Sequence, residues 1–307
     1  LLAADTLIER AVTDKDGTLK FVSDLPLGQY YVKEVEAPKG YVKSEDVYEI
    51  DGTSTDSSVA VLEFEAEFKN FSTKIDISKT EITGEHELVG ATLTIVDMHG
   101  NVIDTWVSDG TEHRIERIPV GKYILREEIA PYGYKIATEI EFEVEETAEV
   151  QKVTMVDEIV KGKLVIVKTD EKTGKGIEGV EFEIRDEKGN VIETLVTDKD
   201  GRAESKELEI GVYENGAYKD DMKYYVVETK AAQGYVPDET VREVVFRYDD
   251  KEAPEIVLHE LSVTNKPIIP EGPKTGDDSN PFLFAGIAVA GLGLVVLALL
   301  RKKKEDK

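Results

Sequence analysis

Short runs of alternating apolar and polar residues fill the first 267 positions of the chain. TLTIV, YILRE, EIEFEVE and KVTMV are representative, and this period of two is typical of β-strands with one buried face. The segments between the runs contain Asp-Lys-Asp-Gly at 14–17 and 198–201 and Lys-Gly-Asn at 188–190, which are hairpin-turn sequences. No amphipathic helix is evident in this region. The pattern therefore predicts all-β domains of the β-sandwich type.

One motif occurs three times in this region. It reads YYVKEVEAPKGY at 30–41, YILREEIAPYGY at 123–134 and YYVVETKAAQGY at 224–235. Each copy ends in Gly-Tyr and carries a Glu at the same distance before the final Tyr. Repeats of this length indicate independent domains in tandem rather than solenoid units. A longer spacing between Gly201 and the third Glu predicts an insertion around residues 213–221.

The repeats and the changes in composition predict the domain boundaries. We expect a truncated β-sandwich at 1–71, a second at 72–160, a third with an insertion at 161–267, a linker at 268–280, a transmembrane helix at 281–300 and a basic cytoplasmic tail at 301–307.

The transmembrane prediction rests on one long apolar segment. Residues 282–300, FLFAGIAVAGLGLVVLALL, contain no charged residue, and a helix of this length crosses a hydrocarbon core of about 30 Å. Arg301-Lys302-Lys303-Lys304 follows directly and favours a cytoplasmic position for that end. Everything upstream is then expected outside the cytoplasm.

Just before this segment lies Pro273-Lys274-Thr275-Gly276. The order of this motif, the apolar span and the basic tail resembles the sorting signal of Gram-positive surface proteins, Leu-Pro-X-Thr-Gly, which sortase cuts between Thr and Gly. The resemblance implies sortase as a partner, and peptidoglycan or another pilin subunit as the site of attachment. The helix would hold the chain in the membrane before sorting. Gly272 replaces the usual Leu, and a permanently membrane-anchored protein remains the alternative.

The N-terminal sequence LLAADTLIERAV lacks the basic region of a signal peptide and includes Asp5 and Glu9. Because an exported protein needs such a peptide, we expect the chain to be the C-terminal part of a longer precursor. Its expected location is the extracellular surface of a Gram-positive cell wall.

The amino-acid composition excludes several classes of binding partner and reactive site. The 307 residues include 38 Lys+Arg and 64 Asp+Glu, a formal net charge of −26, which disfavours nucleic acid because phosphates are repelled. The absence of cysteine excludes disulfides, Cys-ligated zinc and thiol catalysis. The four histidines are scattered without paired spacing. We expect no metal and no cofactor.

Polar side chains share the apolar face of several predicted strands. In KIDISK, Lys79 lies on the face of Ile75 and Ile77, and Lys168 occupies the same position in LVIVK. The Glu of the repeated motif and an Asn or Asp at the end of each repeat also fall on apolar faces. These residues are Glu34, Glu127, Glu228, Asn70, Asp157 and Asn265.

Two explanations account for this costly placement. In the first, each Lys–Glu pair is a structural ion pair, or the strand ends that carry it point into solvent. In the second, the lysine, the Glu and the Asn or Asp react with one another. Desolvation lowers the pKa of a lysine and raises that of a glutamic acid, giving a neutral amine beside a protonated acid. The amine then attacks the side-chain carbonyl of the Asn or Asp, and the Glu polarises that carbonyl and transfers protons.

The motif YILREEIAPYGY resembles the E box of SpaA-type, Cna-B-like pilin and adhesin domains, and the resemblance covers nearly the whole region before the linker. It implies Ig-like, prealbumin-like β-sandwiches and favours the reactive explanation. Carried over position by position, it implies two complete crosslinking sites: Lys79 with Asp157 and Glu127, and Lys168 with Asn265 and Glu228.

The first repeat offers Glu34 and Asn70, and its lysine is expected upstream of Leu1. Two positions depart from the pattern of the family. Asp157 stands where the other repeats have Asn, and Ala232 replaces the proline of the E box.

A crosslink between the first and last strands would make each domain resistant to pulling. The sequence therefore predicts a cell-wall-anchored stalk, either a pilus subunit or an adhesin, with a host or cell-surface ligand as a further candidate partner. We expect no enzymatic turnover beyond self-crosslinking. The alternative is the C-terminal spacer and wall anchor of a surface enzyme whose catalytic domain lies upstream.

Overall fold

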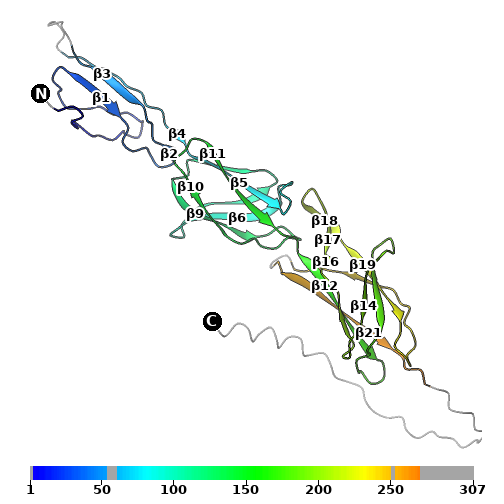
Figure 1. Ribbon diagram of the computed structural model, residues 1–307. Coiled ribbons are helices and arrows are strands. Elements are labelled where there is room, and N and C mark those ends of the chain that lie inside the picture. The colour runs from blue at the N-terminus through cyan, green and yellow to red at the C-terminus, as the bar shows by residue number, and fades with distance from the viewer. Residues whose placement is uncertain (1–2, 54–60, 250–252, 270–307) are drawn as a thin grey trace, which may run out of the picture. The chain divides into compact units, whose positions relative to one another are not determined.

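The computed structural model describes residues 3–53, 61–249 and 253–269. Across these residues the regular structure consists of β-strands, without an α-helix (Figure 1). The all-β prediction is confirmed. The predicted helix at 281–300 and the motif Pro273–Gly276 lie outside the described residues, and no helix able to cross a bilayer occurs within them. One compact unit extends from Leu1 to Pro267.

The second repeat is a sandwich of two sheets. One sheet has the order β11-β5-β8 and the other has the order β10-β9-β6-β7. The strands are β5 (Lys74–Glu81), β6 (Val89–Asp97), β7 (Val102–Asp109), β8 (His113–Glu116), β9 (Gly121–Ile129), β10 (Ile140–Val144) and β11 (Val150–Asp157). The first strand, β5, and the last strand, β11, are parallel neighbours.

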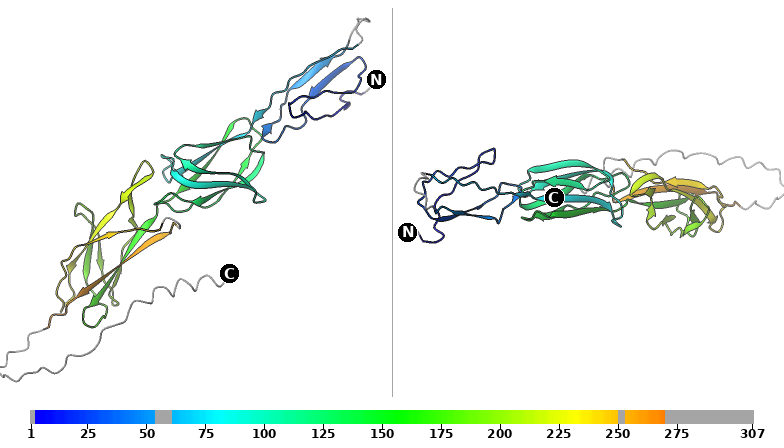
Figure 2. Two further views of the ribbon diagram at one scale, coloured as in Figure 1. Left: turned by 180° about the vertical axis from the view of Figure 1, so that it is seen from behind. Right: turned by 90° about the horizontal axis from the view of Figure 1, so that it is seen from above.

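The third repeat has the same plan with an added hairpin. Its sheets are β14-β13-β19-β20 and β15-β12-β16, with β21 paired to β12. The bounds are β12 (Lys161–Asp170), β13 (Glu181–Arg185), β14 (Val191–Val196), β15 (Arg202–Glu204), β16 (Leu208–Glu209), β19 (Lys223–Lys230), β20 (Arg242–Val245) and β21 (Ile256–Asn265). The orange β21 lies along the green β12 in the views of Figures 1 and 2, and the pair is parallel. The added hairpin consists of β17 (Gly211–Glu214) and β18 (Ala217–Asp221).

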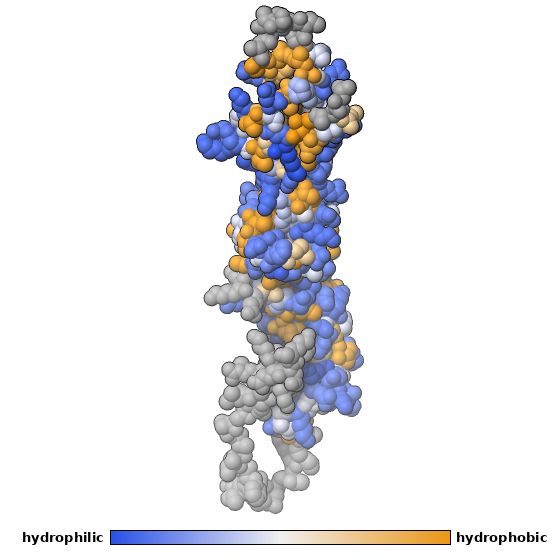
Figure 3. All heavy atoms as spheres, turned by 90° about the vertical axis from the view of Figure 1, so that its left-hand side faces the viewer, coloured by the Kyte–Doolittle hydropathy of each residue, from blue (hydrophilic) through white to orange (hydrophobic). Residues whose placement is uncertain are grey.

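The first repeat contains less regular structure. β1 (Gln29–Lys33) pairs with β3 (Val47–Asp51), and β2 (Tyr41–Val42) pairs with β4 (Phe71–Ser72). Several of its large apolar side chains are exposed, among them Val12 at 87%. Figure 3 shows a face of the molecule on which hydrophilic residues predominate between apolar patches.

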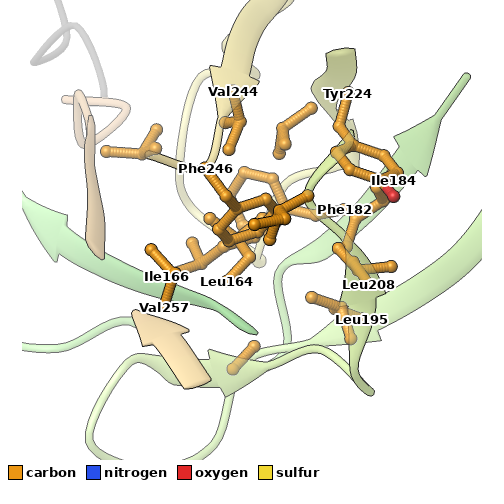
Figure 4. Close-up of a cluster of buried hydrophobic side chains, with 14 of the residues drawn as sticks. Leu164, Ile166, Phe182, Ile184, Leu195, Leu208, Tyr224, Val244, Phe246 and Val257 are labelled. Carbon is orange, nitrogen blue, oxygen red and sulfur yellow. The ribbon is translucent and has the colours of Figure 1, made fainter. Parts of the chain in front are cut away.

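Each of the two complete sandwiches has its own hydrophobic core. In the second repeat, alternate residues of β6 and β9, such as Leu93, Ile95 and Leu125, are fully buried. In the third repeat, the core surrounds Phe182 and Phe246 (Figure 4). The main residues of that core are Leu164, Ile166, Val180, Phe182, Ile184, Ile210, Tyr224, Val226, Val244, Phe246 and Val263.

We expect Phe246→Ala to destabilise the third repeat by about 3–5 kcal/mol, because the ring is fully buried and its loss leaves a cavity. Native-state hydrogen exchange of β12 and β13 measures the change. Phe71→Ala is the control, because Phe71 is 64% exposed and its removal is expected to change stability by about 0.5 kcal/mol or less. Equal effects of the two substitutions would contradict this description of the core.

Candidate functional site

The second repeat brings Lys79, Glu127 and Asp157 together in its interior. Their exposed fractions are 2%, 7% and 1%. Lys79 comes from β5 and Asp157 from β11, both in one sheet, whereas Glu127 comes from β9 in the opposite sheet. The three side chains therefore meet between the two layers of the sandwich.

The pairing of the first and last strands sets this meeting. In the parallel pair β5–β11, Asp157 lies opposite Glu81, two positions beyond Lys79. In the pair β12–β21, Asn265 lies opposite Asp170, two positions beyond Lys168. Since side chains two positions apart share a face of a sheet, the lysine and its partner point the same way in both repeats.

The contacts in the second repeat are short. Lys79 Nζ donates a hydrogen bond to Asp157 Oδ1 and lies 3.0 Å from Glu127 Oε1. The backbone N–H of Ala137 donates to Glu127 Oε2 at 2.6 Å, which fixes the orientation of the carboxylate. Asp157 Oδ2 is buried and accepts no hydrogen bond from the described residues.

The third repeat holds Lys168, Glu228 and Asn265 in the same arrangement. Lys168 Nζ is 2.5 Å from Asn265 Oδ1 and 2.9 Å from Glu228 Oε2. Asn265 Nδ2 donates to Glu228 Oε1 at 2.8 Å. One carboxylate thus touches both the lysine amine and the amide nitrogen of the asparagine. The ring of Phe182, fully buried, lies 5.8 Å from Lys168 Nζ and keeps the amine in apolar surroundings.

The first repeat presents a partial version of this site. Asn70 Nδ2 donates to Glu34 Oε2 at 2.7 Å, and the backbone N–H of Ser44 donates to the same oxygen at 2.6 Å. Both Glu34 and Asn70 are half-buried. The orientation of the Glu by a backbone N–H after the repeated motif matches that of Glu127.

Burial decides the electrostatics of the two complete sites. Burial raises the pKa of Asp157, Lys79 opposes this shift and the Glu127 carboxylate adds to it, and the net result is a pKa of about 7. Burial lowers the pKa of Lys168, against the opposing effect of Glu228. Both shifts favour the uncharged forms, which are the forms in which an amine is nucleophilic and a carboxylic acid can lose its hydroxyl.

The Gly-Tyr pair that closes each repeated motif has a structural role that the sequence analysis missed. Tyr41 pairs with Ser72, Tyr134 with Ile159 and Tyr235 with Pro267. In every case the partner stands two positions after the Asn or Asp of the site. The turn therefore holds the chain where it leaves the last strand. The constant distance between Gly-Tyr and the preceding Glu was the signal available in the sequence.

Two families of known proteins match this chain. Domains described as SpaA, with a prealbumin-like fold, match residues 3–64, 73–159 and 162–215. The chain belongs to the SpaA family. The LPXTG cell wall anchor motif matches residues 273–307. These matches confirm the resemblance drawn from the repeated motif and the sorting signal, and with them the prealbumin-like fold.

Individual relatives agree with the SpaA assignment. The serine-aspartate repeat-containing protein D of Staphylococcus aureus (strain Newman) is 27% identical over 273 residues, covering 76% of this chain and 20% of the relative. The chain therefore spans about a fifth of that relative's length. The solved structure of the Bacillus anthracis TIE protein is 31% identical, covers 79% of this chain and 42% of that one, and has a TM-score of 0.50. This SpaA-family chain is a surface protein of the Gram-positive cell wall with pilin-like domains.

Proposed function

We propose that this chain is a wall-anchored stalk, a pilus subunit or an adhesin, whose second and third repeats crosslink themselves and which sortase attaches through Pro273–Gly276. The observation that carries the proposal is the burial of a lysine amine between a carboxylate and an Asn or Asp in both complete sandwiches. An ion pair can form at the solvent-exposed surface without the desolvation cost that this burial carries.

The third repeat supplies the geometry for a transamidation. Lys168 Nζ, as the neutral amine, attacks Cγ of Asn265, and a new Nζ–Cγ amide bond forms while the Cγ–Nδ2 bond breaks. Glu228 accepts a proton from Nζ through Oε2 and delivers one to Nδ2 through Oε1, because Oε2 lies 2.9 Å from Nζ and Oε1 accepts a hydrogen bond from Nδ2. The nitrogen Nδ2 leaves as ammonia.

The second repeat supports a condensation. Lys79 Nζ attacks Cγ of the protonated Asp157, the Nζ–Cγ bond forms and one Cγ–O bond breaks. The departing hydroxyl takes a proton that Glu127 has received from Nζ and leaves as water. The raised pKa of Asp157 supports this route, since a carboxylate ion would have to expel an oxide.

Crosslinking also resolves the energetic cost of the site. An unpaired buried charge is disfavoured by several kcal/mol, and removal of one partner of a buried pair costs about 3–5 kcal/mol. Conversion of the lysine and its partner to a neutral amide leaves the Glu as the only ionisable side chain in the triad. An ion pair without reaction would retain the full desolvation cost.

The position of the bond suits a stalk. It would join the first and last strands of each sandwich, which are already parallel neighbours. In a parallel pair at the two ends of a domain, tension acts along both strands, and an amide bond between them carries it. The bond would also close loops of 78 and 97 residues and so restrict the unfolded chain, by about 4–5 kcal/mol in the entropic treatment of crosslinks.

We predict that the intact mass of the folded chain falls short of the sequence mass by one water and one ammonia. Glu127→Gln is expected to restore the water and Glu228→Gln the ammonia, because each removes the proton acceptor of one triad. Glu128→Gln is the matched control, since Glu128 is the exposed neighbour of Glu127 on β9. A full sequence mass in well-folded wild-type protein would reduce the triads to ion pairs.

The two crosslinks are expected to differ in their pH dependence. Reaction in the second repeat requires a protonated Asp157, whose pKa of about 7 lies above its ordinary value, so the proton is present below pH 7 and lost above it. The test uses a chain that has been kept unfolded in urea since its extraction from inclusion bodies and has therefore not yet reacted. After dilution from urea, its loss of water is predicted to be about tenfold slower at pH 8 than at pH 6.

Time-resolved intact mass follows both reactions in one sample. Loss of ammonia by the third repeat should not show this fall, because Asn265 carries no ionisable proton. Asp157→Asn is the control, since it is expected to convert the second repeat to ammonia loss and to abolish the difference. Parallel pH profiles of the two wild-type repeats would contradict the protonation scheme.

We further predict that the mature protein ends at Thr275, joined to peptidoglycan or to a lysine of another subunit. The match of residues 273–307 to the cell wall anchor motif supports this expectation. Cell-wall digests from strains with and without sortase measure it. If residues 277–307 stay attached and the protein is extracted by detergent from both strains, the signal is not processed. Thr275→Ala is expected to give the unprocessed form in both.

A further inference from the structure

The third repeat contains a hairpin without a counterpart among the described strands of the second. β17 and β18 form a two-stranded sheet of their own. Asn215 and Gly216, at the turn, have φ values of 51° and 75°, as a two-residue hairpin turn requires. This hairpin is the insertion that the sequence predicted around residues 213–221. None of its residues belongs to the Lys168, Glu228 and Asn265 site.

Reciprocal hydrogen bonds connect the hairpin to the second repeat. The hydroxyl of Tyr213 donates to the carbonyl of Gly133 at 2.9 Å, and the hydroxyl of Tyr134 donates to the carbonyl of Gly216 at 2.7 Å. The hydroxyl oxygen of Tyr248 accepts from the N–H of Gly133 at 2.7 Å. Tyr134 is only 2% exposed, so its bond is shielded from water.

Aromatic packing surrounds these bonds. Tyr132 stacks on Tyr248 with centroids 4.8 Å apart, and it meets the edge of Tyr218 at 4.7 Å. Tyr134 and Tyr213 meet edge to face at 5.5 Å. Such pairs add to the stability given by buried area and fix the geometry of a contact. The hairpin turn also lies close to Leu88 of the second repeat, since a Cβ added at Gly216 would lie 3.0 Å from this buried side chain.

The surface under the hairpin is the turn that ends the repeated motif of the second repeat. Its carbonyl at Gly133 also accepts from the N–H of Val160, which lies in the core of the third repeat. Tyr134 pairs with Ile159, just after the acceptor strand β11. The hairpin therefore contacts the segment through which the second repeat is connected to the third.

The equivalent turns of the other repeats are contacted differently. A Cβ added at Gly40 of the first repeat would lie 2.2 Å from the carbonyl oxygen of Arg117, a tight contact with backbone. A Cβ added at Gly234 of the third repeat would meet nothing within 4 Å. Among the described residues, the turn of the second repeat is the one whose main-chain groups form hydrogen bonds with tyrosine hydroxyls of another repeat.

We propose that the β17–β18 hairpin is a strap that docks on the Tyr132–Tyr134 turn and fixes the third repeat against the second. Adjacent domains move relative to one another unless their interface is extensive and apolar. Five tyrosines, with reciprocal hydroxyl bonds to main-chain carbonyls, supply such an interface without a crosslink between the domains. The strap acts whether or not the two triads react.

Distance measurement between spin labels tests the strap in the full chain. Because the chain has no cysteine, Val107→Cys on β7 and Val191→Cys on β14 provide single labelling sites, both exposed and remote from the tyrosines in sequence. We expect a narrow distribution of distances in this labelled protein. The addition of Tyr134→Phe, Tyr213→Phe and Tyr132→Ala should broaden it roughly twofold, because the hydroxyl bonds and the stacking are removed.

Tyr225→Phe is the matched control, since the hydroxyl of Tyr225 contacts Glu243 within the third repeat. It should leave the width unchanged. Circular dichroism of each variant shows whether the sandwiches remain folded, and the conservative pair Tyr134→Phe/Tyr213→Phe should broaden the distribution even if Tyr132→Ala fails to fold. A wild-type distribution as broad as that of the variants, or equal broadening by Tyr225→Phe, would overturn the proposal.

Discussion

A lysine amine buried against a carboxylate from the opposite sheet is the interaction on which each complete repeat depends. In the second repeat the contact is Lys79 with Glu127, and in the third it is Lys168 with Glu228. A buried charge is disfavoured by several kcal/mol unless an opposite charge lies beside it, so the contact constrains which strands are neighbours. The parallel pairing of first and last strands, the offset of two positions between lysine and acceptor, and the Gly-Tyr turn that holds the exit of the last strand all serve that constraint.

The same arrangement would allow crosslinking at the strands that carry tension through each domain. The Glu of the third repeat touches both the amine and the amide nitrogen that would leave, so one side chain can move the proton between them. In the second repeat the acceptor is a carboxyl group, and its pKa is raised to about 7, chiefly by burial, which would favour its protonated form. The strands that would be joined are the first and the last of each domain, through which the chain enters and leaves it. A surface protein of the cell wall that bears tension would gain from bonds at these positions.

Much of the fold could be predicted from the sequence, because period-two alternation identifies strands and the repeated motif identifies repeats. The placement of Lys79 on the face of Ile75 and Ile77 could be predicted from the alternation of side chains between the two faces of a strand. The pairing of β5 with β11 did not follow from local pattern, since it joins segments far apart in the chain. The family resemblance brought those residues together before the structure did.

Other features were beyond the sequence for physical reasons. The insertion could be located from spacing, but the docking of Tyr213 on Gly133 depends on contacts between repeats that no periodicity encodes. Likewise, the strand pattern placed Glu34 and Asn70 on apolar faces, yet both are half-buried in a repeat with few strands. Burial of a side chain depends on the layers that cover it, and the alternation within one strand does not reveal these.

The most direct test of the central claim is peptide mapping of the folded third repeat by tandem mass spectrometry after proteolysis of the full chain. The account predicts one branched peptide in which the segment ending β12 is joined through Lys168 to the segment ending β21 through Asn265, with the loss of one ammonia. It also predicts that the branched peptide is absent from Glu228→Gln. Recovery of the two segments as separate, unmodified linear peptides from well-folded wild-type protein would contradict it.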